Sequence, residues 1–237
     1  MKNIRLALLI VLGVVTLTSC RKVVGKGPHV TQQRSTGNFS GVELGVPGDL
    51  YYTPSTQFLV EITAQENILD VIQTDVDGGK LKIKVKHGVN LRSHESITVK
   101  ISAPDLRTLG VNGSGNLHAL VPYAPPSLDL YVNGSGDVQV AGITTSRLEA
   151  KISGSGKINV HDGDADYEDL AISGSGDINL AGVVAEEAKT STSGSGDIRV
   201  HVTSKLDTKI SGSGSVYYKG NPIIKMNVSG SGRVTPM

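Results

Sequence analysis

The chain has few aromatic residues. Of its 237 residues, none is tryptophan, two are phenylalanine and seven are tyrosine. Large aromatic rings supply much of the buried surface in rounded protein cores. Their scarcity therefore argues against a large rounded core built on bulky rings.

Neither sign of charge is in excess. Lys and Arg number 23 against 22 Asp and Glu, and loss of residues 1–19 would remove Lys2 and Arg5 and leave 21 against 22. Proteins that bind nucleic acid neutralise its phosphates with a basic patch or stripe. The balance gives no such footprint, and we expect no nucleic-acid partner.

Long apolar runs are missing, with one exception near the N-terminus. Residues 6–17 are predominantly apolar and follow Lys2 and Arg5. A run of this length is too short for an ordinary membrane span, and the charges before it are typical of a secretory signal. We therefore expect the protein to be exported.

Cys20 is the only cysteine, which excludes an internal disulfide bond. It closes the sequence Leu-Thr-Ser-Cys, which resembles the bacterial lipobox, where cleavage precedes a lipidated cysteine. We expect residues 1–19 to be a lipoprotein signal peptide, Cys20 to carry a lipid that anchors the protein to the membrane, and residues 20–27 to be the lipidated start and tether. The alternative is an ordinary signal peptide with an incidental cysteine.

Glycine, in contrast, is abundant, with 29 residues. So much glycine indicates either disorder or a backbone with many tight bends. The tripeptide Gly-Ser-Gly occurs seven times, at intervals of 21, 20, 20, 20, 18 and 18 residues, and periods near 20 are typical of stacked solenoid turns. The repeated glycines are Gly113, Gly115, Gly134, Gly136, Gly154, Gly156, Gly174, Gly176, Gly194, Gly196, Gly212, Gly214, Gly230 and Gly232.

Apolar residues alternate with polar ones on both sides of each tripeptide. Strict alternation indicates β-strands with one buried face, and its persistence through seven copies excludes a disordered Gly/Ser linker. By this parity we expect both glycines of each copy to face the narrow edge of the core, where no inward Cβ fits, and the serine to face outward. The apolar positions nearest the tripeptides include Val111, Val132, Ile152, Ile172, Ile210 and Val228 before them, and Leu117, Val138, Ile158, Ile178, Ile198, Val216 and Val234 after them.

These patterns predict an all-β fold. We expect residues 105–237 to form a β-solenoid, specifically a right-handed parallel β-helix, with the hand taken by analogy from parallel crossovers. Residues 28–104 lack the tripeptide but contain strand-like runs and the turn signal Asp77-Gly78-Gly79. We expect them to form an irregular N-terminal β cap, because terminal turns of solenoids are commonly atypical.

Several motifs together resemble one known family. They are the lipobox, the opening Gly37-Asn38-Phe39-Ser40-Gly41-Val42-Glu43-Leu44, the segment DGGKLKIKV at residues 77–85 and the serial SGSGDI copies. This combination resembles the putative auto-transporter adhesin, head GIN domain family, seen mainly in envelope proteins of Bacteroidetes-type bacteria. The resemblance spans nearly the whole mature chain and implies a β-helical extracytoplasmic domain with an adhesive role. It implies no catalytic residues.

The repeat itself does not match known reactive motifs. Gly-Ser-Gly is neither a nucleophile elbow nor a phosphate loop, so we expect no catalytic residue and no cofactor. Calcium-binding solenoids place an Asp after the glycines of every turn. An interrupted series that contains Lys and Arg does not form a continuous calcium column; here the position is held by Asn116, Asp137, Lys157, Asp177, Asp197, Ser215 and Arg233.

One acidic segment is a separate calcium candidate. Its carboxylates stand at alternate positions, as at the start of a calcium loop. The segment departs from the EF-hand pattern, with Tyr167 in place of Gly and Ser173 in place of the final Glu. We favour a solvated acidic inter-strand loop and no metal site, with calcium as the alternative; the candidate ligands are Asp162, Asp164, Asp166 and Glu168.

We expect the protein to be a non-catalytic, lipid-anchored lipoprotein of the cell envelope, held at the outer membrane on its periplasmic or surface face. It would serve as an adhesin-like binding module for a glycan or protein ligand, or as a structural spacer. The alternative is a carbohydrate-active enzyme, a polysaccharide lyase or hydrolase, although the absence of Trp weakens a sugar platform. The chain closes on the repeat at Ser229–Val234, which leaves a sheet end thinly covered, and two molecules could pair there as a homo-oligomer.

Overall fold

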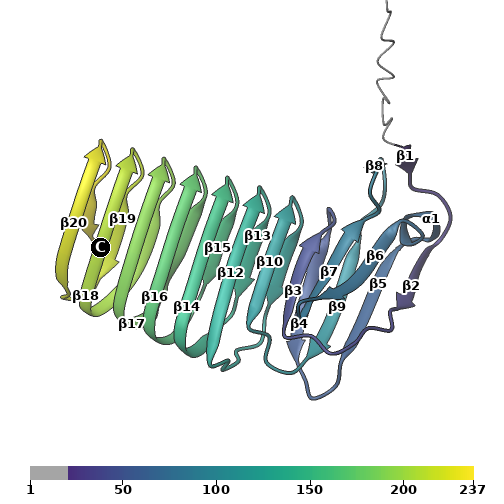
Figure 1. Ribbon diagram of the computed structural model, residues 1–237, viewed down its shortest axis with the longest axis horizontal. Coiled ribbons are helices and arrows are strands. Elements are labelled where there is room, and N and C mark those ends of the chain that lie inside the picture. The colour runs from purple at the N-terminus through teal and green to yellow at the C-terminus, as the bar shows by residue number, and fades with distance from the viewer. Residues whose placement is uncertain (1–20) are drawn as a thin grey trace, which may run out of the picture.

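The computed structural model describes residues 21–237, and the expected signal peptide and Cys20 lie outside these residues. The chain is nearly all β, with 68% strand and 2% helix, and forms a β-solenoid of about six turns (Figure 1). The predicted fold class is confirmed. Within the described residues, no helix has the length and apolar character needed to span a membrane.

Each coil of the solenoid contributes one strand before the Gly-Ser-Gly tripeptide and one after it. Because corresponding strands of neighbouring coils pair in parallel, two parallel sheets run along the rod and meet at the tripeptides. The first sheet contains β3 (Gly41–Gly45), β10 (Thr108–Gly113), β12 (Ser127–Gly134), β14 (Ile143–Gly154), β16 (Gly163–Gly174), the later parts of β17 (Asp177–Gly194) and β18 (Ile198–Gly212), and β20 (Ile223–Gly230). The second sheet contains β4 (Asp49–Pro54), β11 (Asn116–Ala119), β13 (Asp137–Val140), β15 (Lys157–Val160), the early parts of β17 and β18, β19 (Val216–Lys219) and β21 (Val234–Pro236).

The tripeptides are aligned from coil to coil. Gly113 pairs with Gly134, Gly134 with Gly154, and the series continues to Gly230. The middle serines therefore form one uncharged row along the rod, which we call the Gly-Ser-Gly ridge. The expected vertical stacking of the repeat is present.

The two glycines of a tripeptide have different roles, and the expectation that both face the core fails for the first one. Gly174 has φ 131° and is half-buried at the bend, whereas Gly176 is buried. A Cβ on Gly174 would overlap the carbonyl oxygen of Gly154, and a Cβ on Gly176 would overlap that of Gly156. The first glycine thus supplies a left-handed backbone and the second a close approach between coils. Strand parity alone does not predict this difference, because the positive φ turns the chain out of the strand.

In the N-terminal region, the strands next to the solenoid pair in parallel and the strands farther out pair antiparallel. β7 (Lys80–Val85) and β9 (Thr98–Ala103) lie parallel to β3 and β4 and add one further coil. Antiparallel strands β6 (Ile72–Asp77), β5 (Leu59–Gln65) and β2 (His29–Gln33) then cover that coil, with the short helix α1 (Glu66–Leu69) between β5 and β6. The predicted turn joins β6 to β7, with positive φ at Gly78 and Gly79.

A small parallel pair lies at the outer corner of this region. β1 (Arg21–Val24) pairs with β8 (Val89–Arg92), and Val23 on its inner side is buried. Figure 1 places both strands at the N-terminal end, at the level of the Gly-Ser-Gly ridge.

The opposite end of the rod has exposed core positions. Met226 and Val228 of β20 pair with Thr208 and Ile210 of the preceding coil. Thr208 and Ile210 are 0% and 1% exposed, while Met226 and Val228 are 64% and 40% exposed. The following coil therefore buries Thr208 and Ile210, whereas the equivalent side chains of the last coil, Met226 and Val228, remain exposed.

Candidate functional site

An open groove runs along the bends opposite the Gly-Ser-Gly ridge. At these bends each coil passes from the second sheet back to the first. The groove has a volume of about 620 Å³ and takes its lining from five successive bends, which contribute residues 124–126, 144–146, 164–166, 184 and 186, and 203–204. Five coils at the usual spacing between strands give a length of about 20 Å. The groove is therefore long enough for several units of an extended polymer.

A proline-containing loop forms the N-terminal end of the groove. Pro125 and Pro126 line the main groove, and Pro122 and Tyr123 line a neighbouring cavity of about 400 Å³ that shares Asp164 with it. Proline fixes the backbone φ and so stiffens this wall.

Tyr123 secures the same loop to the core. Its ring packs edge-on against Tyr52, with the ring centroids 5.4 Å apart. Burial raises the pKa of Tyr123, so that this hydroxyl stays neutral.

Carboxylates from neighbouring coils meet in the groove. Ala165 pairs with Ala185 and Tyr167 with Glu187, so Asp166 and Glu186 between them lie side by side. Together with Asp164 they give the groove three acidic side chains. Within residues 21–237, none of these three carboxylates forms an ion pair.

Hydroxyl groups complete the lining. Two threonine hydroxyls donate hydrogen bonds to the backbone, Thr145 to the carbonyl of Arg147 at 3.3 Å and Thr203 to that of Ala185 at 3.2 Å. Ser146 and Ser204 add further hydroxyls. Carboxylate and hydroxyl oxygens accept hydrogen bonds, so the groove suits a ligand that carries many donors, such as a chain of sugar hydroxyls.

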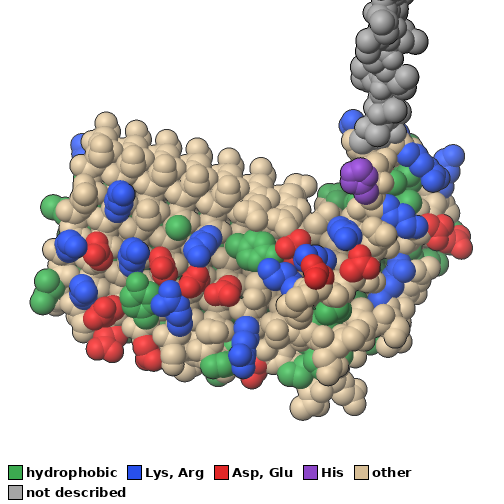
Figure 2. Space-filling model, in the orientation of Figure 1, with side chains coloured by type: hydrophobic (Ala, Val, Ile, Leu, Met, Phe, Trp, Pro, Cys, Tyr) green, Lys and Arg blue, Asp and Glu red, His purple; other side chains and the backbone are tan. Residues whose placement is uncertain are grey.

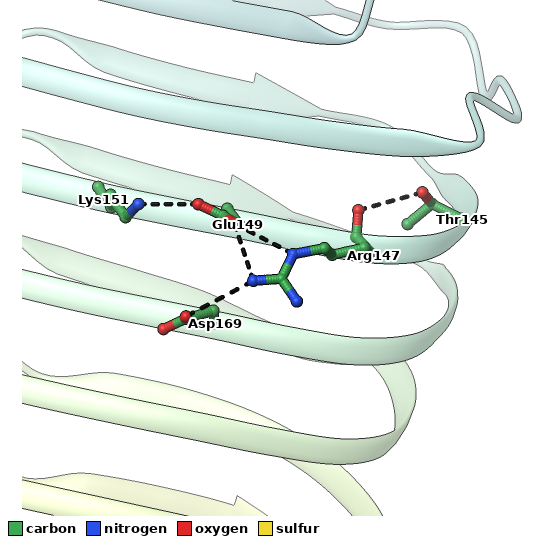
Figure 3. Close-up of polar contacts among 5 residues, drawn as sticks. All are labelled: Thr145, Arg147, Glu149, Lys151 and Asp169. Atoms are coloured by element: carbon green, nitrogen blue, oxygen red, sulfur yellow. Dashed lines mark hydrogen bonds and ion pairs between the residues drawn. The ribbon is translucent and has the colours of Figure 1, made fainter.

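The outer face of the first sheet has a different character, because its charges pair with one another. Glu149 accepts hydrogen bonds from Lys151 at 2.8 Å and from Arg147 at 2.9 Å, and Arg147 also lies 3.8 Å from Asp169 (Figure 3). These two hydrogen bonds lower the pKa of Glu149. Asp129 on the same face has a raised pKa, first through desolvation and then through the negative charge of Glu149. Figure 2 shows basic and acidic side chains interspersed across this part of the molecule.

The acidic segment predicted as a loop is the start of strand β16. Asp162, Asp164 and Asp166 are exposed, but Glu168 is fully buried in the core and points away from them. Among the described residues, no group of three or more acidic, His or Cys side chains is arranged to hold a metal ion. The loop assignment was wrong because Gly163 and Ala165 pair in register with β14, which continues the ladder through the acidic stretch.

Glu168 occupies a core position that neighbouring coils fill with apolar residues. It pairs with Leu148 on one side and with Ala188 on the other. Neither carboxyl oxygen has a hydrogen-bond partner among the described residues. Burial raises the pKa of Glu168 well above its usual range, because the core disfavours the charged carboxylate.

The aspartates that follow the tripeptides stabilise the contact between coils. Asp137 accepts a hydrogen bond from the backbone N–H of Lys157 at 3.0 Å, and Asp177 from that of Asp197 at 3.1 Å. Asp197 in turn accepts one from Ser215 at 2.9 Å. These carboxylates thus serve the stacking of successive coils.

The sequence analysis did not predict the groove as a site. Its hydroxyl residues form short runs about half a period after two of the tripeptides, Thr144-Thr145-Ser146 and Thr203-Ser204. Asp164, Asp166 and Glu186 take the corresponding place after two others, and this polar position was the available signal. Cys20, the predicted lipidation site, lies outside the described residues.

A class of proteins described as putative adhesins shares this β-solenoid architecture. The chain belongs to the family described as putative auto-transporter adhesin, head GIN domain, whose model matches residues 38–222. A search of curated proteins gave no match.

Solved structures of similar chains share the fold. A putative adhesin from Bacteroides fragilis is 25% identical, with a TM-score of 0.86 over 91% of this chain and 100% of its own. A putative lipid binding protein from Parabacteroides distasonis is 25% identical, with a TM-score of 0.79 over 92% and 100%. A putative adhesin from Parabacteroides merdae is 26% identical, with a TM-score of 0.73 over 92% and 99%.

Proposed function

We propose that this protein is a non-catalytic, adhesin-like binding module of the cell envelope that holds an extended glycan in the groove opposite the Gly-Ser-Gly ridge. The observation that carries the proposal is the groove itself, which crosses five coils and contains unpaired carboxylates and several hydroxyls. Membership of an adhesin family agrees with a binding role.

The groove geometry favours a polymer over a compact ligand. Four of its five bends contribute carboxylate or hydroxyl oxygens, so acceptors recur along the axis at about 4.8 Å. A chain of sugars can donate hydroxyl hydrogen bonds to several of these acceptors at once. Each bond is weak in water, and affinity accumulates through their number.

The test is binding of the mature protein to immobilised envelope polysaccharides and host glycan chains. We expect retention without release of shortened products. The double substitution Asp166→Ala with Glu186→Ala should weaken binding about tenfold or more, since it removes two acceptors at about 1 kcal/mol each.

A matched control removes two acids from the outer face of the first sheet. Glu187 and Asp207 are partly exposed, do not line the groove and lie near Lys205 and Lys225. Glu187→Ala with Asp207→Ala changes the net charge equally and should leave binding unchanged. Equal losses in both double variants would refute the groove as the site, and release of cleaved or unsaturated products would favour a lyase or hydrolase.

The anchorage that we propose is a lipid on Cys20, which would hold the mature protein at the outer membrane. This follows from the lipobox-like sequence and from the envelope role of the family. Labelled palmitate should enter the wild-type protein in cells and should not enter a Cys20→Ala variant. Equal labelling of the two would dismiss the anchor.

A further inference from the structure

One end of the rod carries a cluster of basic side chains that the glycan groove does not use. The segments 21–27 and 86–94 contain Arg21, Lys22, Lys26, Lys86 and Arg92, and neither segment contains Asp or Glu. Pairing of β1 with β8 brings the two segments together, with Lys22 beside Asn90 and Val24 beside Arg92. We call these five side chains the basic corner.

The cations of the basic corner are directed to solvent. All five are exposed, and within the described residues none of them forms an ion pair. The Lys86 ammonium donates a hydrogen bond to the backbone carbonyl of Asp70 at 2.6 Å, which fixes its position without neutralising its charge.

Few acidic groups oppose this charge. Three carboxylates lie near the corner: that of Glu66 in α1, which is close to Gly27, that of Glu95, which follows β8, and that of Asp70, whose backbone carbonyl contacts Lys86. Three acids against five cations leave the corner positive, although the chain as a whole is nearly neutral.

A shallow recess and an apolar side chain accompany the cations. The recess, of about 360 Å³, is lined by Arg21, Lys22, Lys26 and Asn67. Val24 is 46% exposed between them. Cations around a recess with an exposed valine can take phosphate groups while the valine contacts the acyl boundary.

We propose that the basic corner is a docking surface for an anionic phospholipid bilayer. It lies directly after Cys20, so a lipid on that residue would hold the corner against the membrane. The proposal builds on the proposed anchorage, and it adds that the folded domain itself contacts the headgroups. A single acyl signal is strengthened by a nearby polybasic surface in this way.

The geometry also assigns an orientation to the rod. Figure 1 places β1 and β8 on the side of the Gly-Ser-Gly ridge, opposite the bends that form the groove. The ridge is uncharged and does not repel anionic headgroups, as its neutral upper edge in Figure 2 illustrates. Docking of the corner would therefore turn the acidic groove away from the membrane, toward extracellular or periplasmic ligands.

The experiment uses residues 21–237, which contain every strand of the fold and have no site for the lipid. Binding is measured by co-sedimentation with vesicles of phosphatidylglycerol and phosphatidylcholine, against vesicles of phosphatidylcholine alone. We expect binding to the anionic vesicles at low salt and loss of binding at 0.5 M NaCl. Inorganic phosphate at the same ionic strength as NaCl should compete no better than NaCl, which separates a bilayer surface from a site for free phosphate.

The decisive comparison is between two triple variants. Lys22→Gln, Lys26→Gln and Arg92→Gln should weaken binding about fivefold for each cation, or about 100-fold together. Lys205→Gln, Lys209→Gln and Lys225→Gln, at the other end of the rod, remove the same charge and should leave binding within about threefold.

Several results would overturn the proposal. They are equal losses in the two triple variants, equal binding to neutral vesicles, and no binding to anionic vesicles at low salt. The protein used has no lipid, and no glycan is present. A lack of vesicle binding would therefore refute the docking surface without affecting the palmitate test of the anchor or the glycan test of the groove.

Discussion

At the scale of single residues, the glycines and the buried glutamate set local stability in opposite ways. The first glycine of each tripeptide has a backbone conformation that other residues adopt only with strain. Glu168 instead places an ionisable group where its neighbours are apolar. Both features make a point substitution informative.

Substitution of Gly174 by alanine should destabilise the protein by about 3 kcal/mol. The cost combines the strained φ with overlap between the new Cβ and the Gly154 carbonyl oxygen. Urea unfolding followed by circular dichroism measures the change. The control Ser175→Ala, at the exposed middle of the same tripeptide, should shift the unfolding free energy by less than about 0.5 kcal/mol. Equal effects would show that the bend tolerates a side chain.

Stability should fall as pH rises because of Glu168. Its pKa is raised in the folded protein, so the folded state binds one more proton than the unfolded state above the unfolded pKa of about 4.3. Below that pH the carboxyl is protonated in both states, and the free energy of unfolding does not depend on its ionisation. As pH rises from the unfolded pKa to the folded pKa, the free energy of unfolding falls by up to about 1.4 kcal/mol per pH unit. Urea unfolding of wild type and Glu168→Gln at pH 5 and pH 8 isolates the effect.

In that comparison, the free energy of unfolding of the glutamine variant should rise relative to that of the wild type as pH rises. Glu168→Leu should be more stable than the wild type at pH 8 by about 2 kcal/mol, since no buried polar group remains. Parallel pH profiles for wild type and Glu168→Gln would show that the carboxyl is ionised and solvated in the folded protein.

At the scale of elements, the strands are joined by side-chain as well as backbone hydrogen bonds. The Asp177 carboxylate accepts the N–H of Asp197 on the next coil, and Asp137 does the same for Lys157. The aspartate of SGSGDI is therefore explained by coil stacking, which asparagine also serves at Asn116.

Replacement of Asp177 tests this role. Asp177→Ala should lower the free energy of unfolding by about 1–2 kcal/mol, because the Asp197 N–H loses its acceptor. Asp177→Asn keeps an acceptor oxygen and should stay within about 0.5 kcal/mol of the wild type. Thermal and urea unfolding of the three proteins give the comparison. A loss in the asparagine variant as large as in the alanine variant would instead assign the effect to charge.

At the scale of the whole molecule, the two ends of the rod differ. The N-terminal end is covered by antiparallel strands, whereas the last coil exposes Ile223, Met226 and Val228. Residues 213–237 carry Lys219, Lys225 and Arg233 and no acidic residue. Apolar contact there favours pairing of two molecules, and like charge opposes it.

We therefore expect self-association that increases with salt. Light scattering at high protein concentration should give a larger mass at 0.5 M NaCl than at low salt, because screening weakens the repulsion. Met226→Lys should abolish the increase, and Leu120→Lys, at an exposed loop residue, should not. A strictly monomeric mass under all conditions would argue against pairing at this end.

The residue pattern alone predicts the all-β class, the stacking of the repeats and the turn at Gly78 and Gly79. A residue pattern that recurs at the spacing of the coils constrains every coil at once, so the tripeptides are predicted to align whatever path the bends between them take. The resemblance of the SGSGDI copies to one family was likewise readable from the residues and is confirmed.

The side-chain contacts between coils away from the tripeptides were not predictable from the residue pattern, and the three-dimensional fold set them. In the fold, Gly174 and Gly176 have different roles, the Glu168 side chain lies in the core, and Asp166 lies beside Glu186 in a groove. Neighbours about 20 positions apart are set by the path of each bend. The bends opposite the ridge vary in length and sequence, so the path there depends on three-dimensional packing and not on the local pattern.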